Sequence, residues 1–154
     1  MRTINLSRPI IEALYDEALM LADDVRAAFA GSIEADGSPG RPRDAMARLA
    51  LSSEGLKTTT RMMHVLAWLL NQRAFFSGEL SEKQVRLHGS LPPDRASDAE
   101  QLELIDAETR ALILESEALH RRIARLDAAW RQDFEMDSPA RAFQARIGRE
   151  LGGL

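Results

Sequence analysis

A seam of mostly apolar positions, spaced alternately three and four residues apart, extends across residues 98–135 and constrains the fold more than any other feature. Its members are Leu102, Ile105, Thr109, Leu112, Ser116, Leu119, Ile123, Leu126 and Trp130. A seam of this kind, sustained along a whole segment, is typical of helices in bundles and coiled coils. Acidic residues come early in the segment and basic residues late, an order that suits the helix dipole. We therefore predict a helix from about Asp98 to Glu135 with one buried face.

Two further helices are predicted from periodicity and from end signals. The first extends over about residues 8–30, with Ser7 as its N-cap and Gly31 as its C-terminal stop. The second extends from near residue 44 to residue 77. Gly55 interrupts its pattern, but a single glycine in a helix costs only about 1 kcal/mol relative to alanine. We read residues 44–77 as one long helix.

The connections and the tail complete the predicted architecture. Residues 31–43 are rich in glycine, proline and serine and are read as a loop. The second connection contains Ser81 followed by Gln84, which resembles a capping box and indicates one short helical turn. The fold class is therefore all-α: an antiparallel, up-down-up three-helix bundle over residues 1–137. Residues 138–154 form a flexible or weakly helical C-terminal tail.

The tail carries a short apolar stripe of its own. Phe143, Ile147 and Leu151 follow one another at four-residue spacing. A helix this short is marginal by itself. We therefore expect the tail either to contact a partner through these three side chains or to remain mobile.

Residues 45–77 carry apolar side chains on more than one side of the predicted helix. One stripe consists of Leu49, Leu56, Met63, Ala67, Leu70 and Ala74, and a second of Leu51, Met62, Val65, Leu69 and Phe76. Both stripes can be core, because a helix in a three-helix bundle contacts two neighbours. Trp68 and Phe75 then fall on a third side, and an exposed apolar patch edged by arginine is typical of a partner surface. We expect this segment to serve the bundle and a protein interface together, with a second copy of the chain as the simplest partner.

Composition excludes several classes of function. The net charge of −4 argues against a dedicated duplex-binding protein, which needs a basic surface. The chain has no cysteine, which fits a reducing compartment. Glu12 and Asp16 interrupt any signal-peptide core, and the apolar run at residues 65–70 is far shorter than the roughly 20 residues of a membrane span. A soluble, cytoplasmic protein without a membrane partner is expected.

Catalytic and metal-binding motifs are not recognised in the sequence. His64, His88 and His120 have no second histidine at ligand spacing, and no phosphate-binding or nucleophile motif is present. Glu117 and His120 match the Glu-x-x-His spacing of di-iron bundles, but this match is solitary. We predict no enzyme activity, no cofactor and no metal site, and keep a metalloenzyme at Glu117 and His120 as a remote alternative.

Residues 49–81, "LALSSEGLKTTTRMMHVLAWLLNQRAFFSGELS", resemble the central block of an alphaproteobacterial family, that of the regulator of CtrA degradation. "TTTRMMHVLAWLLNQRA" and the following "GELS" are its specific part, and "EALYDEALMLADDVRAAFA" is similar to the family's opening helix. The resemblance implies a homodimeric three-helix bundle that acts as an adaptor for the ClpXP protease. Such an adaptor works with a primed protease and its primer protein, and delivers cell-cycle transcription regulators as protein clients.

The resemblance also implies a contact surface on the second helix. That surface consists of Thr59, Arg61, Met62, Val65, Trp68, Leu69, Gln72 and Arg73, and Phe76 is assigned with them. A small helical dimer that binds nucleic acid directly as a transcriptional regulator stays as the alternative function.

Overall fold

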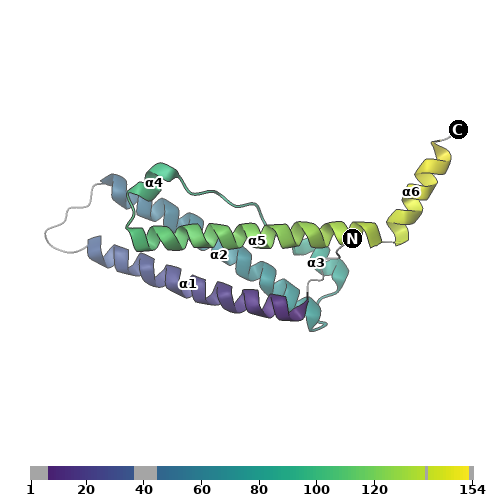
Figure 1. Ribbon diagram of the computed structural model, residues 1–154, viewed down its shortest axis with the longest axis horizontal. Coiled ribbons are helices and arrows are strands. Elements are labelled where there is room, and N and C mark those ends of the chain that lie inside the picture. The colour runs from purple at the N-terminus through teal and green to yellow at the C-terminus, as the bar shows by residue number, and fades with distance from the viewer. Residues whose placement is uncertain (1–6, 37–44, 138, 153–154) are drawn as a thin grey trace.

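The computed structural model describes residues 7–36, 45–137 and 139–152, and all the regular elements within them are α-helices. In chain order they are α1 (Arg8–Asp36), α2 (Ala45–Phe76), α3 (Glu82–His88), α4 (Ala99–Glu103), α5 (Ala107–Asp137) and α6 (Pro139–Leu151). The three long helices α1, α2 and α5 contact one another, and the short helices α3 and α4 lie against α2 (Figure 1). The all-α class is thus confirmed.

The directions of the long helices differ from the predicted alternation. Arg61 of α2 bonds to Ser116 of α5, and Trp68 bonds to Asp127, so the residue numbers of the two helices rise together. α2 and α5 are therefore parallel, whereas α1 lies antiparallel to both (Figure 1). The predicted reversal at every connection is wrong for α5.

The parallel arrangement depends on residues 89–98, which connect α3 to α4 without regular secondary structure. The chain turns at the end of α2, forms α3, and then returns along the bundle before α5 begins (Figure 1). An extended segment of this length spans up to about 30 Å, enough to travel most of the way back along α2. A long crossover is what parallel neighbours require, whereas antiparallel helices can be joined by a short loop.

α1 is longer than predicted. It passes through Gly31 and ends at Asp36, so Gly31 is not its C-terminal stop. The extra length is tied to the start of α5, because the Ser32 hydroxyl donates to the Asp106 carboxylate and shares a hydrogen bond with the Thr109 hydroxyl. A tertiary contact here outweighs the local helix-ending tendency of glycine. The predicted loop at residues 31–43 lies largely outside the described residues.

The second predicted helix has its expected limits, whereas the third does not. α2 continues unbroken through Gly55, where an added Cβ would approach the Phe29 ring to 3.2 Å. The predicted third helix is instead divided into α4 and α5. Asp106 begins α5 by accepting hydrogen bonds from the backbone N–H and the hydroxyl of Thr109, as an N-cap does.

The end signal predicted at Ser81 is confirmed by α3. Ser81 and Gln84 form the predicted capping box at the start of α3. α6 begins at Pro139, and proline is common in the first turn of a helix. Residues 138, 153 and 154 lie outside the described residues.

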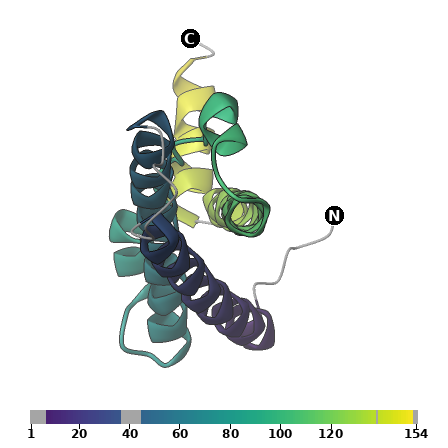
Figure 2. The same ribbon diagram turned by 90° about the vertical axis from the view of Figure 1, so that its left-hand side faces the viewer.

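The hydrophobic core lies where α1, α2 and α5 meet. Its buried members are Ile11, Leu14, Ala18, Leu21 and Val25 of α1, Met62, Val65, Trp68 and Leu69 of α2, and Leu119 and Ile123 of α5. A smaller cluster of Ala50, Ile105 and Ile113 closes the end near α4. In the view of Figure 2 the three long helices lie beside one another around this core. None of the described helices is both long and apolar enough to cross a membrane.

Candidate interaction surfaces

The outer face of α2 exposes a continuous row of large apolar side chains. Its members, which we call the outer stripe, are Met46, Leu49, Leu56, Met63 and Leu70. Their exposed fractions range from 48% at Leu70 to 69% at Leu56. Scattered exposed apolar residues are normal on a protein surface, but a contiguous row along one helix marks an interaction site.

The spacing of the outer stripe is that of a coiled-coil seam. Leu49, Leu56, Met63 and Leu70 recur every seven residues. Small side chains occupy the alternate positions of the same seam: Ser53, Thr60 and Ala67 between the large residues, and Ala74 after Leu70. Large and small side chains therefore alternate along one face. Such a face can accept the large side chains of a second helix in the spaces above its small ones.

The surface predicted from the sequence lies on another side of α2, and most of it is buried within the chain. Arg61, Met62, Val65, Trp68, Leu69 and Gln72 are buried. Trp68 is only 2% exposed, so its predicted place on an open third side is wrong. The physical reason is that α5 and the segment 89–98 cover this side. Of the remaining predicted residues, Thr59 is exposed, and Arg73 and Phe76 are half-buried.

Arg61 joins three parts of the chain inside the protein. Its Nε donates to both carboxylate oxygens of Asp94 at 2.8 Å, and its two terminal nitrogens donate to the Ser116 hydroxyl and to the Arg95 carbonyl. A buried guanidinium is stable only when its donors are satisfied in this way. Arg61 therefore holds the crossover against α2 and α5 and is not free to bind a partner.

Asp127 plays a similar part farther along the bundle. Its carboxylate accepts hydrogen bonds from the Trp68 indole N–H at 2.9 Å and from the backbone N–H of Leu91 at 3.4 Å. Arg131 forms an ion pair with the same carboxylate at 3.0 Å. The indole is therefore fixed by both its apolar surroundings and its polar edge. This arrangement belongs to the core and explains why a tryptophan occupies this position.

Arg73 and the ring side chains gather at the end of α2. The Arg73 guanidinium pairs with Glu12 at 3.0 Å and lies over the Tyr15 ring. Its hydrogen bond to Glu12 raises the pKa of Arg73. Beside it, the Phe75 ring meets the rings of Phe76 and Trp130 edge-on. These contacts join α2 to α1 and α5 within one chain.

α6 presents the predicted tail stripe openly. Phe143, Ile147 and Leu151 are exposed on one side of this helix. The helix points away from the three long helices (Figure 1). The structure thus places these three side chains together, as the spacing predicted.

Asp106 is the clearest electrostatic site among the described residues. Partial burial acts to raise its pKa, but hydrogen bonds from Thr109 and Ser32 outweigh that effect, and the pKa lies below the ordinary value for aspartate. The charged form of the carboxylate is thus favoured where α1 meets the start of α5. These hydrogen bonds join α1 to the start of α5.

The histidines make no metal cluster within the part of the chain that the structure describes. No group of three or more histidine, aspartate or glutamate side chains there is placed to hold an ion. His120, named above with Glu117, is buried and its Nε2 lies 3.1 Å from the Pro92 carbonyl oxygen. That nitrogen helps to hold the crossover segment 89–98 against α5.

Comparison with known proteins places the chain in a family. The family described as "Protein of unknown function (DUF1465)" matches residues 3–150. No curated protein and no solved structure matches the chain.

Proposed function

The chain belongs to the DUF1465 family, and we propose that it is a non-catalytic adaptor that delivers protein clients to the ClpXP protease. Its clients are cell-cycle transcription regulators, and it works in the cytoplasm with the protease's primer protein. The proposal starts from the resemblance of residues 49–81 to the family of the regulator of CtrA degradation. An adaptor needs surfaces for two proteins at once, because tethering a client raises its effective concentration at the protease.

The observation that carries the proposal is the outer stripe of α2. Large exposed side chains in a helical seam are expensive for a monomer to keep and useful for a protein that binds others. α6 supplies a second apolar stripe at the far end of the chain. Two separate apolar surfaces on one small helical chain suit a protein that connects partners.

The outer stripe is proposed to form the homodimer. Large side chains recur at Leu49, Leu56, Met63 and Leu70, with small ones between them. An antiparallel pairing of two α2 helices, about a two-fold axis level with residues 61 and 62, sets the large residues of one copy over the small residues of the other. Two-fold dimers use the same patch on both copies, and one self-complementary stripe meets that requirement.

A pair of cysteine variants tests this arrangement, because the chain has no cysteine of its own. Thr60→Cys lies on the outer stripe close to this axis and is expected to be cross-linked between two copies by a short thiol-specific reagent. Thr59→Cys is the matched control, since it is exposed and adjacent but lies off the stripe. Dimer formation is read on a non-reducing gel and by light scattering. Preferential cross-linking of Thr59→Cys would favour the surface predicted from the sequence instead.

The adaptor role is tested separately by reconstituted proteolysis. The chain is expected to accelerate degradation of a cell-cycle transcription regulator by ClpXP in the presence of the primer protein. Degradation of an unrelated tagged substrate by the same protease should not change. If no client is degraded faster, while a labelled DNA duplex is bound in a salt-dependent manner, the alternative of direct nucleic-acid binding replaces the adaptor role.

A further inference from the structure

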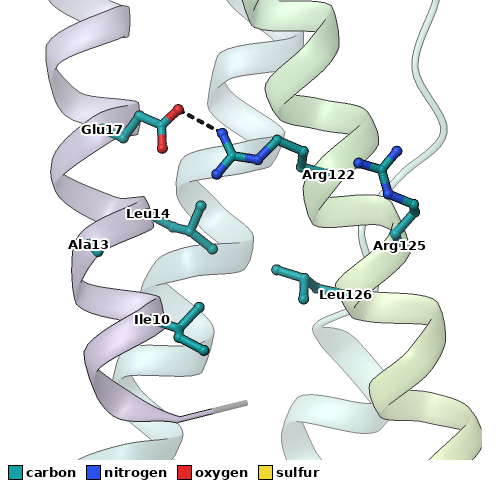
Figure 3. Close-up of a pocket in the computed structure, with 7 residues that line it drawn as sticks. All are labelled: Ile10, Ala13, Leu14, Glu17, Arg122, Arg125 and Leu126. Carbon is teal, nitrogen blue, oxygen red and sulfur yellow. Dashed lines mark hydrogen bonds and ion pairs between the residues drawn. The ribbon is translucent and has the colours of Figure 1, made fainter. Parts of the chain in front are cut away.

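An apolar groove of about 580 Å³ lies between α1 and α5. Ile10, Ala13 and Leu14 line it from α1, and Leu126 lines it from α5. Figure 3 shows the Ile10, Leu14 and Leu126 side chains directed into the space between the two helices. Leu14 belongs to the core, whereas Ile10 is 46% exposed. The core is thus open to the surface along this groove.

The rim of the groove is basic on the α5 side. Arg122 bridges to Glu17 at 2.8 Å across the groove (Figure 3). Arg125, one turn away, makes no contact of that kind with the residues that the structure describes. A ligand that suits this site therefore has an apolar face and a negative charge beside it.

α6 offers an apolar face with an acidic side chain at its border, although the helix also contains three arginines that lie farther from this face. Its apolar stripe of Phe143, Ile147 and Leu151 is exposed, and Glu150 borders that stripe on the helix. The C-terminal end of a helix also carries partial negative charge. A helix of this length is marginal without packing, so it gains stability from any groove that it can reach.

The reach of α6 matches the position of the groove. At 1.5 Å per residue, Leu126 lies about 16 Å before the end of α5, and Leu151 lies about 18 Å after the start of α6. If α6 folds back along α5, Leu151 arrives level with Leu126. Pro139, at the start of α6, lacks the N–H that would continue the hydrogen bonds of α5, so the chain can change direction there.

We propose that the groove between α1 and α5 is the docking site of the chain's own α6. In the docked state α6 runs antiparallel to α5, with Ile147 beside Ile10 and Leu151 beside Leu126. Glu150 and the C-terminal end of α6 then lie near Arg125. Docking covers the groove and the α6 stripe together. A partner can therefore bind α6 through this stripe only after α6 has left the groove. This inference does not depend on the adaptor role.

Disulfide trapping in the full-length chain tests the proposal. The double variant Ala13→Cys with Leu151→Cys places one thiol in the groove and one on the α6 stripe. The control pairs Ala13→Cys with Arg149→Cys, whose side chain points to the opposite side of α6. Oxidation is followed at low protein concentration on non-reducing gels, with circular dichroism to confirm that both variants are folded.

We expect the Leu151→Cys pair to form a disulfide within one chain at least tenfold faster than the Arg149→Cys pair. Adding Ile147→Asp to the Leu151→Cys pair should slow disulfide formation to the rate of the Arg149→Cys control. Equal rates for the two pairs, or a rate that Ile147→Asp does not change, would overturn the proposal. Cross-linking only between two chains would also overturn it, because α6 would then dock on a second copy.

Discussion

The Nε of Arg61 lies 2.8 Å from both carboxylate oxygens of Asp94, although the two residues are 33 positions apart in the chain. Arg61 is on the covered side of α2, and Asp94 is on the crossover segment. The guanidinium is buried, whereas the Asp94 side chain retains 21% exposure. This ion pair anchors the segment that allows α2 and α5 to run in the same direction.

Asp94→Asn is expected to destabilise the fold by about 3 kcal/mol, because it leaves a buried guanidinium without its counter-charge. Urea unfolding followed by circular dichroism measures the loss. Asp23→Asn is the control, since Asp23 pairs with Arg26 on the surface, where both side chains are more than 70% exposed. An exposed pair of that kind contributes between 0 and about 1 kcal/mol. Equal losses in the two variants would show that the Arg61 pair is not buried in solution.

Trp68→Gln is expected to cost about 3–5 kcal/mol, the range for truncating a large buried aromatic side chain. Trp68 packs in the core and donates to Asp127, so both its apolar and its polar contacts are lost. Thr59→Gln, an exposed position on the same helix, should change stability by less than about 0.5 kcal/mol. Thermal unfolding measures both variants. A stable, folded Trp68→Gln monomer would return this residue to the surface that the sequence analysis assigned to it.

Substitutions at two helical glycines are expected to have opposite effects. Gly31→Ala in α1 should stabilise by up to about 1 kcal/mol, because alanine favours the helix and nothing lies near the new Cβ. Gly55→Val should destabilise by about 1–3 kcal/mol through overpacking against the Phe29 ring. Replacing Phe29 with leucine in the Gly55→Val background should recover part of the loss. A Gly55→Val variant that is more stable than the unmodified chain would mean that α1 and α2 are farther apart in solution.

Much of the helical framework could be predicted from local signals. The start of α1, the full length of α2 and the Ser81 capping box each depend on side chains within a few positions of one another. Such signals act before any tertiary contact forms. The break at Asp106 has a local signal, its cap contact with Thr109, but the continuous apolar seam favoured a single helix there. The extension of α1 beyond Gly31 was missed for the opposite reason. Ser32 and Asp106 are 74 positions apart, and neither residue announces the contact.

The sequence could not reveal which stripe of α2 faces the bundle. Apolar side chains occur nearly all round this helix, so the periodicity of its sequence is equally compatible with either of two faces being buried. The choice depends on the direction of α5, which in turn depends on the path of residues 89–98. One signal was nevertheless present. On one side of α2, from Leu49 to Ala74, large and small residues alternate regularly. That side suits a helix–helix seam better than the mixed side that holds Arg61 and Trp68.

The lowered pKa of Asp106 implies that the stability of the fold depends on pH. Its folded-state pKa lies below the ordinary aspartate value of 3.8, so the carboxylate stabilises the fold at neutral pH. That contribution is lost as the pH falls below 3.8 and through the lower folded-state pKa, where Asp106 becomes protonated. Asp106→Ala should lose about 1 kcal/mol at pH 7 through loss of the N-cap, and should show a weaker decline of stability in acid.

Ser32→Ala serves as the matched test of the cause. It removes one of the hydrogen bonds that lower the Asp106 pKa but leaves the carboxylate and the Thr109 contacts in place. The pKa of Asp106 should therefore rise toward the ordinary value, and the acid loss of stability that Asp106 contributes should be smaller and complete at a higher pH than in the unmodified chain. Carboxyl chemical shifts followed by NMR through the acid range report this pKa directly. A titration of Asp106 that is the same in Ser32→Ala and in the unmodified chain would mean that the bond between α1 and α5 does not form in solution.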